Sequence, residues 1–526
     1  MGRWVKRLLL AALVFGACWG GAIWYWRSGQ RAPDATGLVL MLLVLPLALL
    51  GVLWLVRRLP ALLAGSAGAA AGAAGTSQAN PGSAATPAPA PPAPPALAIV
   101  AAALRSPHGD GAAGLAKAID EHSAHPALDP ELLDDDGYPQ MSARAPLDDG
   151  WGDGGALREQ VATWLALNGH GGAAWSDGAA SSDAAAWSEE QWRTLALAAG
   201  VAEELGRAAA SHAALRPRAT PPGPAAAPLP TLPPLPILQI LPLWPAGWDD
   251  AHCDAAGAWI SHLVAAAGWP AERIVVARGA AQGGGAAPDA AGEAGAHAGE
   301  ALARLAQHVA DGRSPLVAIV LAGASHIGAA SVGQWSAEGA IFNARHPQGK
   351  IPGEGAAGLL LADPAQALLF GDTPHAHALL HSAGALREAS ADGARRVEAG
   401  TLHALAGRVL ADGGASAGQV AMLVADTGHR ASRTMELMHF AGAVLPGLDA
   451  GDDVVRLGGA CASCGEAGYL TALAVAFHHS AEREAPVLCI ANEHPLRRGA
   501  ALILPAAPAA SIATSPAISP PSPVTS

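Results

Sequence analysis

Short buried strands alternate with amphipathic helices through the C-terminal part of the chain. Apolar runs at 316–322, 419–425 and 487–491 are too short for helices and suit strands covered on both faces. Helical periodicity lies between them, at 300–310 and 469–478. This alternation favours an α/β domain whose strands are mostly parallel.

The same alternation reaches well into the N-terminal half. Apolar runs predict strands at 97–104, 237–241 and 273–277, and helical spacing covers 188–215 and 251–267. The pattern therefore predicts one long α/β domain.

A glycine-rich segment at 350–362 leads into another buried strand. Gly353 and Gly355 remove the Cβ where the backbone bends or approaches another segment closely, and Glu354 lies between them. Lys350 precedes the glycines, so the segment lacks the Gly-Lys-Ser/Thr of a phosphate-binding loop. We interpret it as a structural motif.

Two uninterrupted apolar runs precede this domain, at 8–26 and 37–56. Each is long enough to cross about 30 Å of hydrocarbon as a helix, and the short connection between them forces a hairpin. Basic clusters at 3–7 and 57–58 place both ends in the cytoplasm. A signal peptide is the competing interpretation of the first run, but Trp, Tyr and Trp replace its small-residue cleavage site.

These patterns divide the chain into four parts. Residues 1–58 are expected to form the membrane hairpin, and 59–96, rich in Pro, Ala and Gly, a linker. Residues 97–505 form the predicted domain, with a proline-rich internal loop at 217–236, and 506–526 a disordered tail. The expected location is the inner membrane of a bacterium, with a multi-pass anchor in the lipid bilayer and the soluble domain in the cytoplasm.

Composition and charge argue against some classes of partner and indicate the redox compartment. The formal net charge of −13 argues against a general phosphate-binding surface, so nucleic acid is not an expected partner. Five cysteines, an odd number, argue against a disulfide framework and indicate a reducing compartment.

Two predicted helices share an opening sequence. Gly299-Glu-Ala and Gly465-Glu-Ala each begin a helix that leads into a buried strand and a turn. This echo predicts two related halves that face each other across a pseudo-twofold axis.

The order of these elements resembles the thiolase superfamily, specifically the β-ketoacyl synthases. Four segments carry the resemblance, at 299–323, 350–362, 421–434 and 454–504, and Pro-Gly-Glu-Gly-Ala-Ala in the second is the most specific of them. The resemblance covers roughly 97–505. It implies a five-layer α-β-α-β-α fold built from two pseudo-repeats, here preceded by two transmembrane helices, and it implies a dimer.

The residues that carry the family's chemistry are absent from the matching positions. The nucleophilic Cys of the family would fall close to His297, and no Cys lies between 254 and 460. The two active-site His residues of the family fall at Asp426 and Ala462. Because decarboxylative condensation needs a thiolate and two His residues, the resemblance implies a degenerate site and hence a pseudoenzyme.

Four polar residues are candidates for a ligand pocket. Ser325 and His326 follow a predicted strand, where functional residues often lie in α/β sheets. Asp426 and His429 lie in the turn after another strand. Packing and surface-loop roles are the alternatives.

The cysteines and two histidines provide the remaining candidates. Cys253 or Cys461 would be the nucleophile if the protein is an active acyltransferase with a displaced site. Cys461 and Cys464 form a Cys-x-x-Cys pair before a helix, which suits packing, a redox pair or half of a zinc site. A full zinc site needs two more ligands, and we interpret His478 and His479 as a solvated helix end. No metal and no cofactor are expected.

The leading hypothesis is a membrane-tethered, catalytically inactive ketosynthase-like scaffold or binding protein. Three alternatives remain: a non-catalytic partner subunit of an active β-ketoacyl synthase, an active acyltransferase, and an accessory of a secretion or envelope complex. The expected partners are a second subunit, in a homodimer or heterodimer through the thiolase-like domain, and an acyl-carrier protein or a synthase subunit.

Overall fold

The computed structural model describes most of the predicted domain, at residues 96–134, 137–152, 154–170, 187–216, 234–277, 297–312, 315–371, 377–393 and 397–505. The membrane hairpin, nearly all of the linker, most of the proline-rich loop and the tail lie outside the described residues. Within the described ranges, no helix is both long enough and apolar enough to span a bilayer.

Five strands form the sheet of the first half. They pair in the order β6-β5-β7-β8-β1, parallel from β6 to β7 and antiparallel from β7 to β1. Their bounds are β1 (Leu97–Ser106), β5 (Leu238–Leu243), β6 (Ile274–Val276), β7 (Val317–Ser325) and β8 (Glu354–Ala362).

The second half repeats this topology. Its strands pair in the order β11-β10-β12-β13-β9, again parallel across three strands and antiparallel across the rest. Counted along the chain within each half, both orders are 3-2-4-5-1, which agrees with the predicted internal repeat. The bounds are β9 (Ala378–Leu386), β10 (Met422–Ala425), β11 (Val454–Arg456), β12 (Val487–Ala491) and β13 (Arg497–Pro505).

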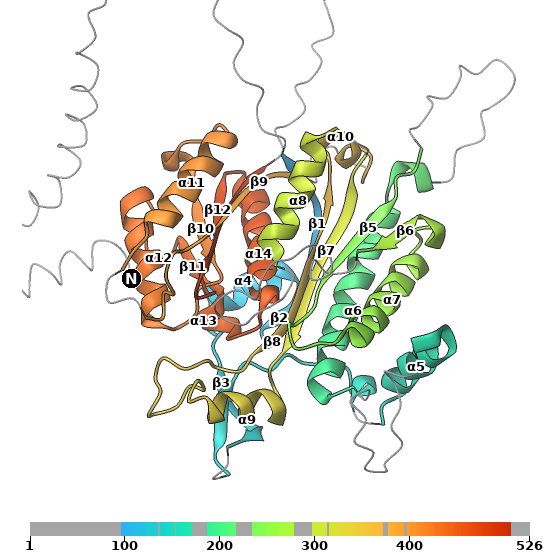
Figure 1. The fold of residues 1–526 in the computed structure, drawn as a ribbon. Helices are drawn as coiled ribbons and strands as arrows, with labels where there is room; N and C mark the ends of the chain where they lie inside the picture. The colour runs from blue at the N-terminus through green and yellow to red at the C-terminus, as the bar shows by residue number, and fades with distance from the viewer. Residues whose placement is uncertain are drawn as a thin grey trace, which may run out of the picture. The chain divides into compact units, whose positions relative to one another are not determined.

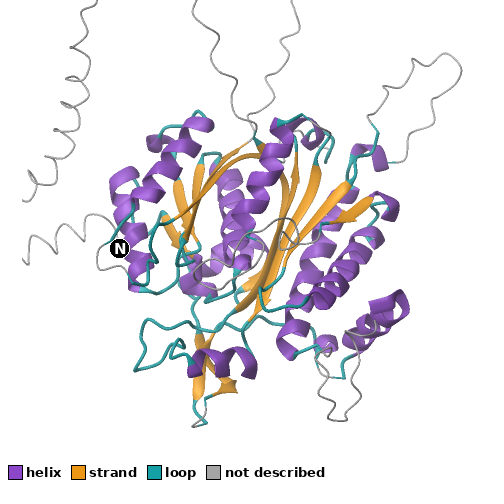
Figure 2. Ribbon diagram, viewed as in Figure 1, coloured by secondary structure: helices purple, strands orange, loops and turns teal. Residues whose placement is uncertain are grey.

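The two sheets meet where β1 and β9 pair over a short antiparallel stretch. Helices pack on both outer faces and between the sheets, so helical and sheet layers alternate across the domain (Figures 1 and 2). The first sheet is covered by α6 (Glu189–Ala210) and α7 (Asp250–Ala266), and the second by α11 (Gly400–Asp412) and α12 (Ala431–Val444). The central layer contains α4 (Gly111–Asp120), α8 (Ala298–Ala310) and α14 (Glu466–Arg483).

Burial explains why the central strands read as continuous apolar runs. Every residue of β7 and of β8 is buried, because helices cover both faces of their sheet. The inner faces of both sheets and the central helices form one hydrophobic cluster, and each outer helical layer packs in a second cluster on its own sheet. The mixed α/β prediction is confirmed.

Several shorter helices and strands lie outside the two five-stranded arrangements and the helices that cover them. A separate two-stranded sheet projects from the domain beside α9 (Figure 1). The remaining elements are β2 (Gly109–Asp110), β3 (Ala127–Leu133), β4 (Pro139–Ser142), α5 (Ala156–Leu165), α9 (Ala329–Ala337), α10 (Pro364–Ala367) and α13 (Leu457–Cys461).

The glycine-rich segment owes its glycines to close contact. A Cβ on Gly353 would lie 2.4 Å from the carbonyl oxygen of Cys461, and one on Gly355 would lie 3.1 Å from the carbonyl oxygen of Arg105. Neither glycine has a positive φ. The prediction of close approach is therefore correct, whereas Gly355 lies inside β8 and not in a turn.

Candidate functional site

A cavity of about 1090 Å³ opens where β7 and β10 end and where α8 and α14 begin. Ligands of open α/β sheets commonly bind beyond the carboxyl ends of the strands. The positions that the resemblance matched to the family's active site, His297, Asp426 and Ala462, all line this cavity. Residues that are far apart in the sequence are therefore brought together there.

His297 occupies the N-cap of α8 and is 7% exposed. Its Nδ1 donates a hydrogen bond of 2.8 Å to Oε1 of Glu466, the first residue of α14. The other carboxylate oxygen of Glu466 accepts the backbone N–H of Ala298 at 2.8 Å. One carboxylate therefore orients the imidazole and also satisfies a free N–H at the start of α8.

The second imidazole nitrogen has a different environment. Nε2 of His297 is buried and has no hydrogen-bond partner among the described residues. Because Nδ1 carries the proton that Glu466 accepts, Nε2 of the neutral ring is a hydrogen-bond acceptor. The pair has the form of an oriented base, and nothing in it supplies the thiolate of a ketosynthase. Sequence reasoning missed Glu466 as a partner, although the repeated Gly-Glu-Ala contains it.

Asp426 follows β10 and is partly buried in the wall of the cavity. Its Oδ1 accepts backbone N–H groups of Asn492 at 2.8 Å and Glu493 at 3.1 Å. The pKa of the Asp426 carboxyl is raised to about 7, chiefly by burial and also by the nearby carboxylate of Glu493, against the backbone hydrogen bonds and Arg498, which lower it. At neutral pH this side chain is therefore divided between its neutral and charged forms.

The loop after β12 supplies charged residues that sequence reasoning did not assign. Glu493 accepts the N–H of Gly428 at 2.7 Å and pairs with Arg430 at 2.7 Å. Arg498 binds Glu436 with two hydrogen bonds, of 2.9 and 2.8 Å, and both side chains are buried. Both arginines, Arg430 before α12 and Arg498 in β13, line the cavity and are paired with carboxylates of the same chain.

Ala462 has unusual backbone angles, with φ 58° and ψ −153°. Glycine is the residue that normally adopts this region, so the conformation costs of the order of 1–3 kcal/mol. The segment is held in place by the bridge between Pro352 and Ser463 and by the hydrogen bond from Ser463 N to Ile351 O. The glycine-rich segment thus shapes the wall of the cavity.

Ser325 lines the cavity, but its hydroxyl is engaged in the core. Its Oγ donates to Oε2 of Glu354 at 2.8 Å, and Glu354 is fully buried. Arg193 binds both oxygens of the same carboxylate, at 2.8 and 2.5 Å. Ser325 therefore lines the cavity, as expected for a pocket residue, while its hydroxyl also serves the buried carboxylate of Glu354.

The two candidate histidines differ in position. His326 lines the cavity, and its ring lies 4.9 Å from that of Trp335. The ring of His429 lies 5.2 Å from that of Phe342, and His429 is not among the described residues that line the cavity. Asp426 therefore lines the cavity and His429 does not, although the two residues are close in sequence.

The candidate thiols are poorly suited to nucleophilic attack. Cys461 is buried, and desolvation raises its pKa well above the usual range; the pKa of Cys464 is raised to about 12. Burial and three nearby aspartates raise the pKa of Cys253 to about 11. Cys489 is buried with a raised pKa as well. The described cysteines are free thiols that remain protonated at neutral pH.

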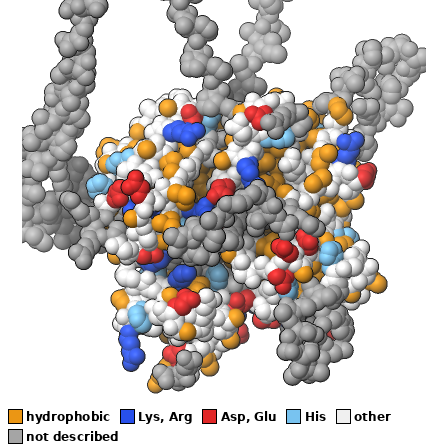
Figure 3. Space-filling view, viewed as in Figure 1, with side chains coloured by type: hydrophobic (Ala, Val, Ile, Leu, Met, Phe, Trp, Pro, Cys, Tyr) orange, Lys and Arg blue, Asp and Glu red, His pale blue; other side chains and the backbone are white. Residues whose placement is uncertain are grey.

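Figure 3 shows the face of the domain that Figure 1 presents. Among the described residues on this face, lysine and arginine side chains are scattered and alternate with acidic ones. This distribution agrees with the net charge of −13 and gives no support for a nucleic-acid partner.

Comparisons with known proteins find likeness in structure only. No protein-family model and no curated sequence matches the chain. A ketosynthase from module 6 of the bacillaene synthase of Bacillus subtilis 168 matches with a TM-score of 0.50 and 10% identity, over 78% of this chain and 72% of that one. The oxazolomycin ketosynthase domain of Streptomyces albus JA3453 matches with a TM-score of 0.48 and 12% identity, over 78% and 76% of the two chains.

An identity of 10% carries information about the fold alone. The described part of the chain has a mixed α/β fold that is similar to that of the bacillaene ketosynthase.

Proposed function

We propose that this protein is a ketosynthase-like binding protein that holds an acyl group in the cavity without forming a covalent acyl-enzyme. The observation that carries the proposal is His297, which stands where the resemblance places the nucleophile and is hydrogen-bonded to Glu466 at 2.8 Å. The raised pKa values of Cys253, Cys461 and Cys464 support it, because none of these thiols supplies a thiolate at neutral pH.

The polar groups of the cavity suit binding of a thioester or carboxylic acid end. Nε2 of His297 is an acceptor for a hydroxyl or acid proton, and the neutral form of Asp426 is a donor for a carbonyl oxygen. A bound acyl group would thereby be held by directed hydrogen bonds and would not be transferred.

Incubation of the purified full chain with acyl-CoA and acyl-carrier-protein thioesters tests this function. We expect intact-protein mass spectrometry to show no acyl adduct, and calorimetry to show non-covalent binding. Replacement His297→Leu is expected to weaken binding about 10-fold, since it removes one buried hydrogen bond. His125→Leu, in an exposed loop, is the control. An adduct on any cysteine, or no binding at all, would contradict the proposal.

A second candidate function is that of a partner subunit, attached to the membrane by the hairpin at 8–26 and 37–56. The feature that favours a second subunit is the edge strand β6, whose outer side pairs with no described strand and whose Val275 is 51% exposed. Such an edge is a template for pairing with another chain. A homodimer and a heterodimer with a synthase both fit this surface.

The two proposals about assembly are tested with one preparation. The full chain is expected to need detergent for extraction from bacterial membranes and to be a dimer by light scattering. Val275→Asp is expected to give monomers, because a charge on the edge opposes strand pairing. Leu386→Asp, also exposed but at the end of β9, is the control. A freely soluble chain would refute the tether, and an unchanged dimer would refute the β6 interface.

A further inference from the structure

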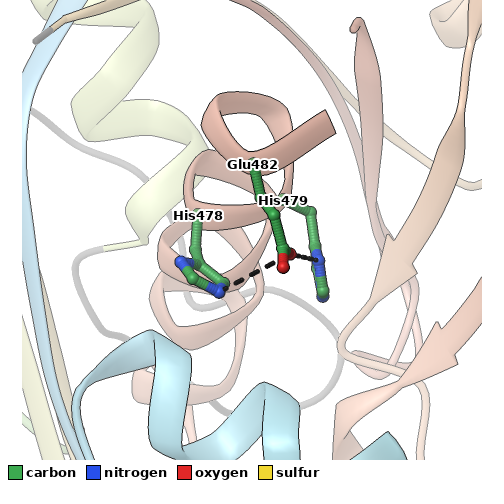
Figure 4. Close-up of side chains that lie close together, drawn as sticks. All are labelled: His478, His479 and Glu482. Carbon is green, nitrogen blue, oxygen red and sulfur yellow. Dashed lines mark ion pairs between the residues drawn. The ribbon is translucent and has the colours of Figure 1, made fainter. Parts of the chain in front are cut away.

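We propose that the C-terminal end of α14 carries a zinc site formed by His478, His479 and Glu482. Figure 4 shows the two imidazole rings on either side of the Glu482 carboxylate. Nε2 of His478 lies 3.8 Å, and Nδ1 of His479 3.4 Å, from the same oxygen, Oε2 of Glu482. Ligand atoms of all three residues lie within 4.8 Å of one another.

These separations match the geometry of a four-coordinate zinc ion. Zinc binds imidazole nitrogen and carboxylate oxygen at about 2.0–2.2 Å, which places neighbouring ligand atoms of a tetrahedron roughly 3.4 Å apart. The contacts of 3.4 and 3.8 Å to Glu482 are close to this value. The two imidazole nitrogens lie within 4.8 Å of each other.

The environment of Nδ1 of His479 favours a metal site over a solvated helix end. The side chain of His479 is only 5% exposed, and its buried Nδ1 lies 3.4 Å from Oε2 of Glu482, which is too long for a good hydrogen bond. Such an atom normally finds a partner in a folded protein. A cation between His479 and Glu482 would satisfy this nitrogen and the carboxylate together.

The donor set favours zinc over calcium and magnesium. Two imidazole nitrogens with one carboxylate suit zinc, whereas hard divalent cations prefer oxygen ligands. His478 and Glu482 have side-chain exposures of 31% and 62%, so the ion is accessible from solvent and a water molecule can complete the tetrahedron. The negative end of the helix dipole also favours a cation there. The adjacent Arg483 is engaged by Asp453 at 3.3 Å.

A zinc ion bound here would stabilise a helix of the central layer of the fold. The three residues lie near the end of α14, whose last residue is Arg483 and whose C-cap, Glu484, has a left-handed φ of 48°. The first residue of the same helix, Glu466, orients His297. A zinc ion would therefore brace the far end of the helix that organises the cavity, independently of whether the cavity binds an acyl group.

Metal titration of the full chain, purified in detergent and stripped with chelator, tests the site. We expect the wild type to bind one more zinc ion than the variant Glu482→Gln. If the variant still binds this ion, its affinity should be at least about 10-fold lower than that of the wild type. Cobalt(II) is expected to give the visible absorption of a four-coordinate ion in the wild type only. Zinc should also raise the melting temperature of the wild type and not of Glu482→Gln.

The matched control is Glu484→Gln, which removes a charge two residues further along without touching the three ligands. Its zinc affinity should equal that of the wild type. His479→Gln should behave as Glu482→Gln, and circular dichroism should check that its fold is retained. Equal zinc binding by Glu482→Gln and wild type would overturn the proposal, as would a wild type that gives no four-coordinate cobalt spectrum.

Discussion

Replacing Asp426 with asparagine is expected to raise the free energy of unfolding by about 4 kcal/mol at pH 8. This is the energy that corresponds to a carboxyl whose pKa is raised from 3.8 to about 7, chiefly by burial. Asparagine cannot ionise, and its Oδ1 can still accept the N–H groups of Asn492 and Glu493. Urea unfolding followed by tryptophan fluorescence measures the change.

The pH dependence has a definite sign. Between about pH 4 and pH 7 the folded protein binds the Asp426 proton more strongly than the unfolded chain, so this carboxyl makes stability fall as pH rises through that window. The advantage of Asp426→Asn should therefore be small near pH 4 and full above pH 7. Asp120→Asn, at the exposed end of α4, should change stability by less than about 0.5 kcal/mol. A stability difference that does not vary with pH would contradict the assignment.

Replacing Arg193 with methionine is expected to cost about 3–5 kcal/mol of folding stability, the loss typical when one partner of a buried ion pair is removed. Glu354 is fully buried, and only the N–H of Ala145 and the hydroxyl of Ser325 would remain to stabilise its charge. Urea unfolding at pH 7 gives the size of the loss.

Two further variants separate this ion pair from other effects. The double variant Arg193→Met with Glu354→Gln should recover part of the lost stability, because no uncompensated charge stays buried. Arg408→Ala breaks a contact of 3.7 Å between Arg408 and Asp412 on the surface and should cost less than about 1 kcal/mol. A loss for Arg193→Met as small as that for Arg408→Ala would show that the buried pair does not support the fold.

Much of the fold followed from local patterns. Continuous apolar runs predicted β7 and β8 because both faces of these strands are covered, and the Gly-Glu-Ala echo corresponds to α8 and α14 in equivalent places of the two halves. Strand ends were less accurate: the run at 419–425 forms a strand only from Met422. Where a strand stops depends on which neighbours it pairs with, and the apolar pattern does not contain that information.

The candidate site was predictable in part. The matched positions His297, Asp426 and Ala462 do line one cavity. The partners of these residues were not foreseen, nor was the hydrogen bond from the hydroxyl of Ser325, which also lines the cavity, to Glu354. Hydrogen-bond partners are chosen by packing between layers, so residue type and spacing along the chain do not indicate them.

The sequence by itself determined the alternation of strands and helices, the repetition of the two halves and the absence of a cysteine between residues 254 and 460. These are properties of neighbouring residues, and periodicity and position express them directly. The tertiary structure alone decided how the polar groups are used. His297 meets Glu466 across 169 residues, and Arg193 meets Glu354 across 161. A buried charge must find a partner wherever the folded layers bring one within reach, and that choice is made only when the layers assemble.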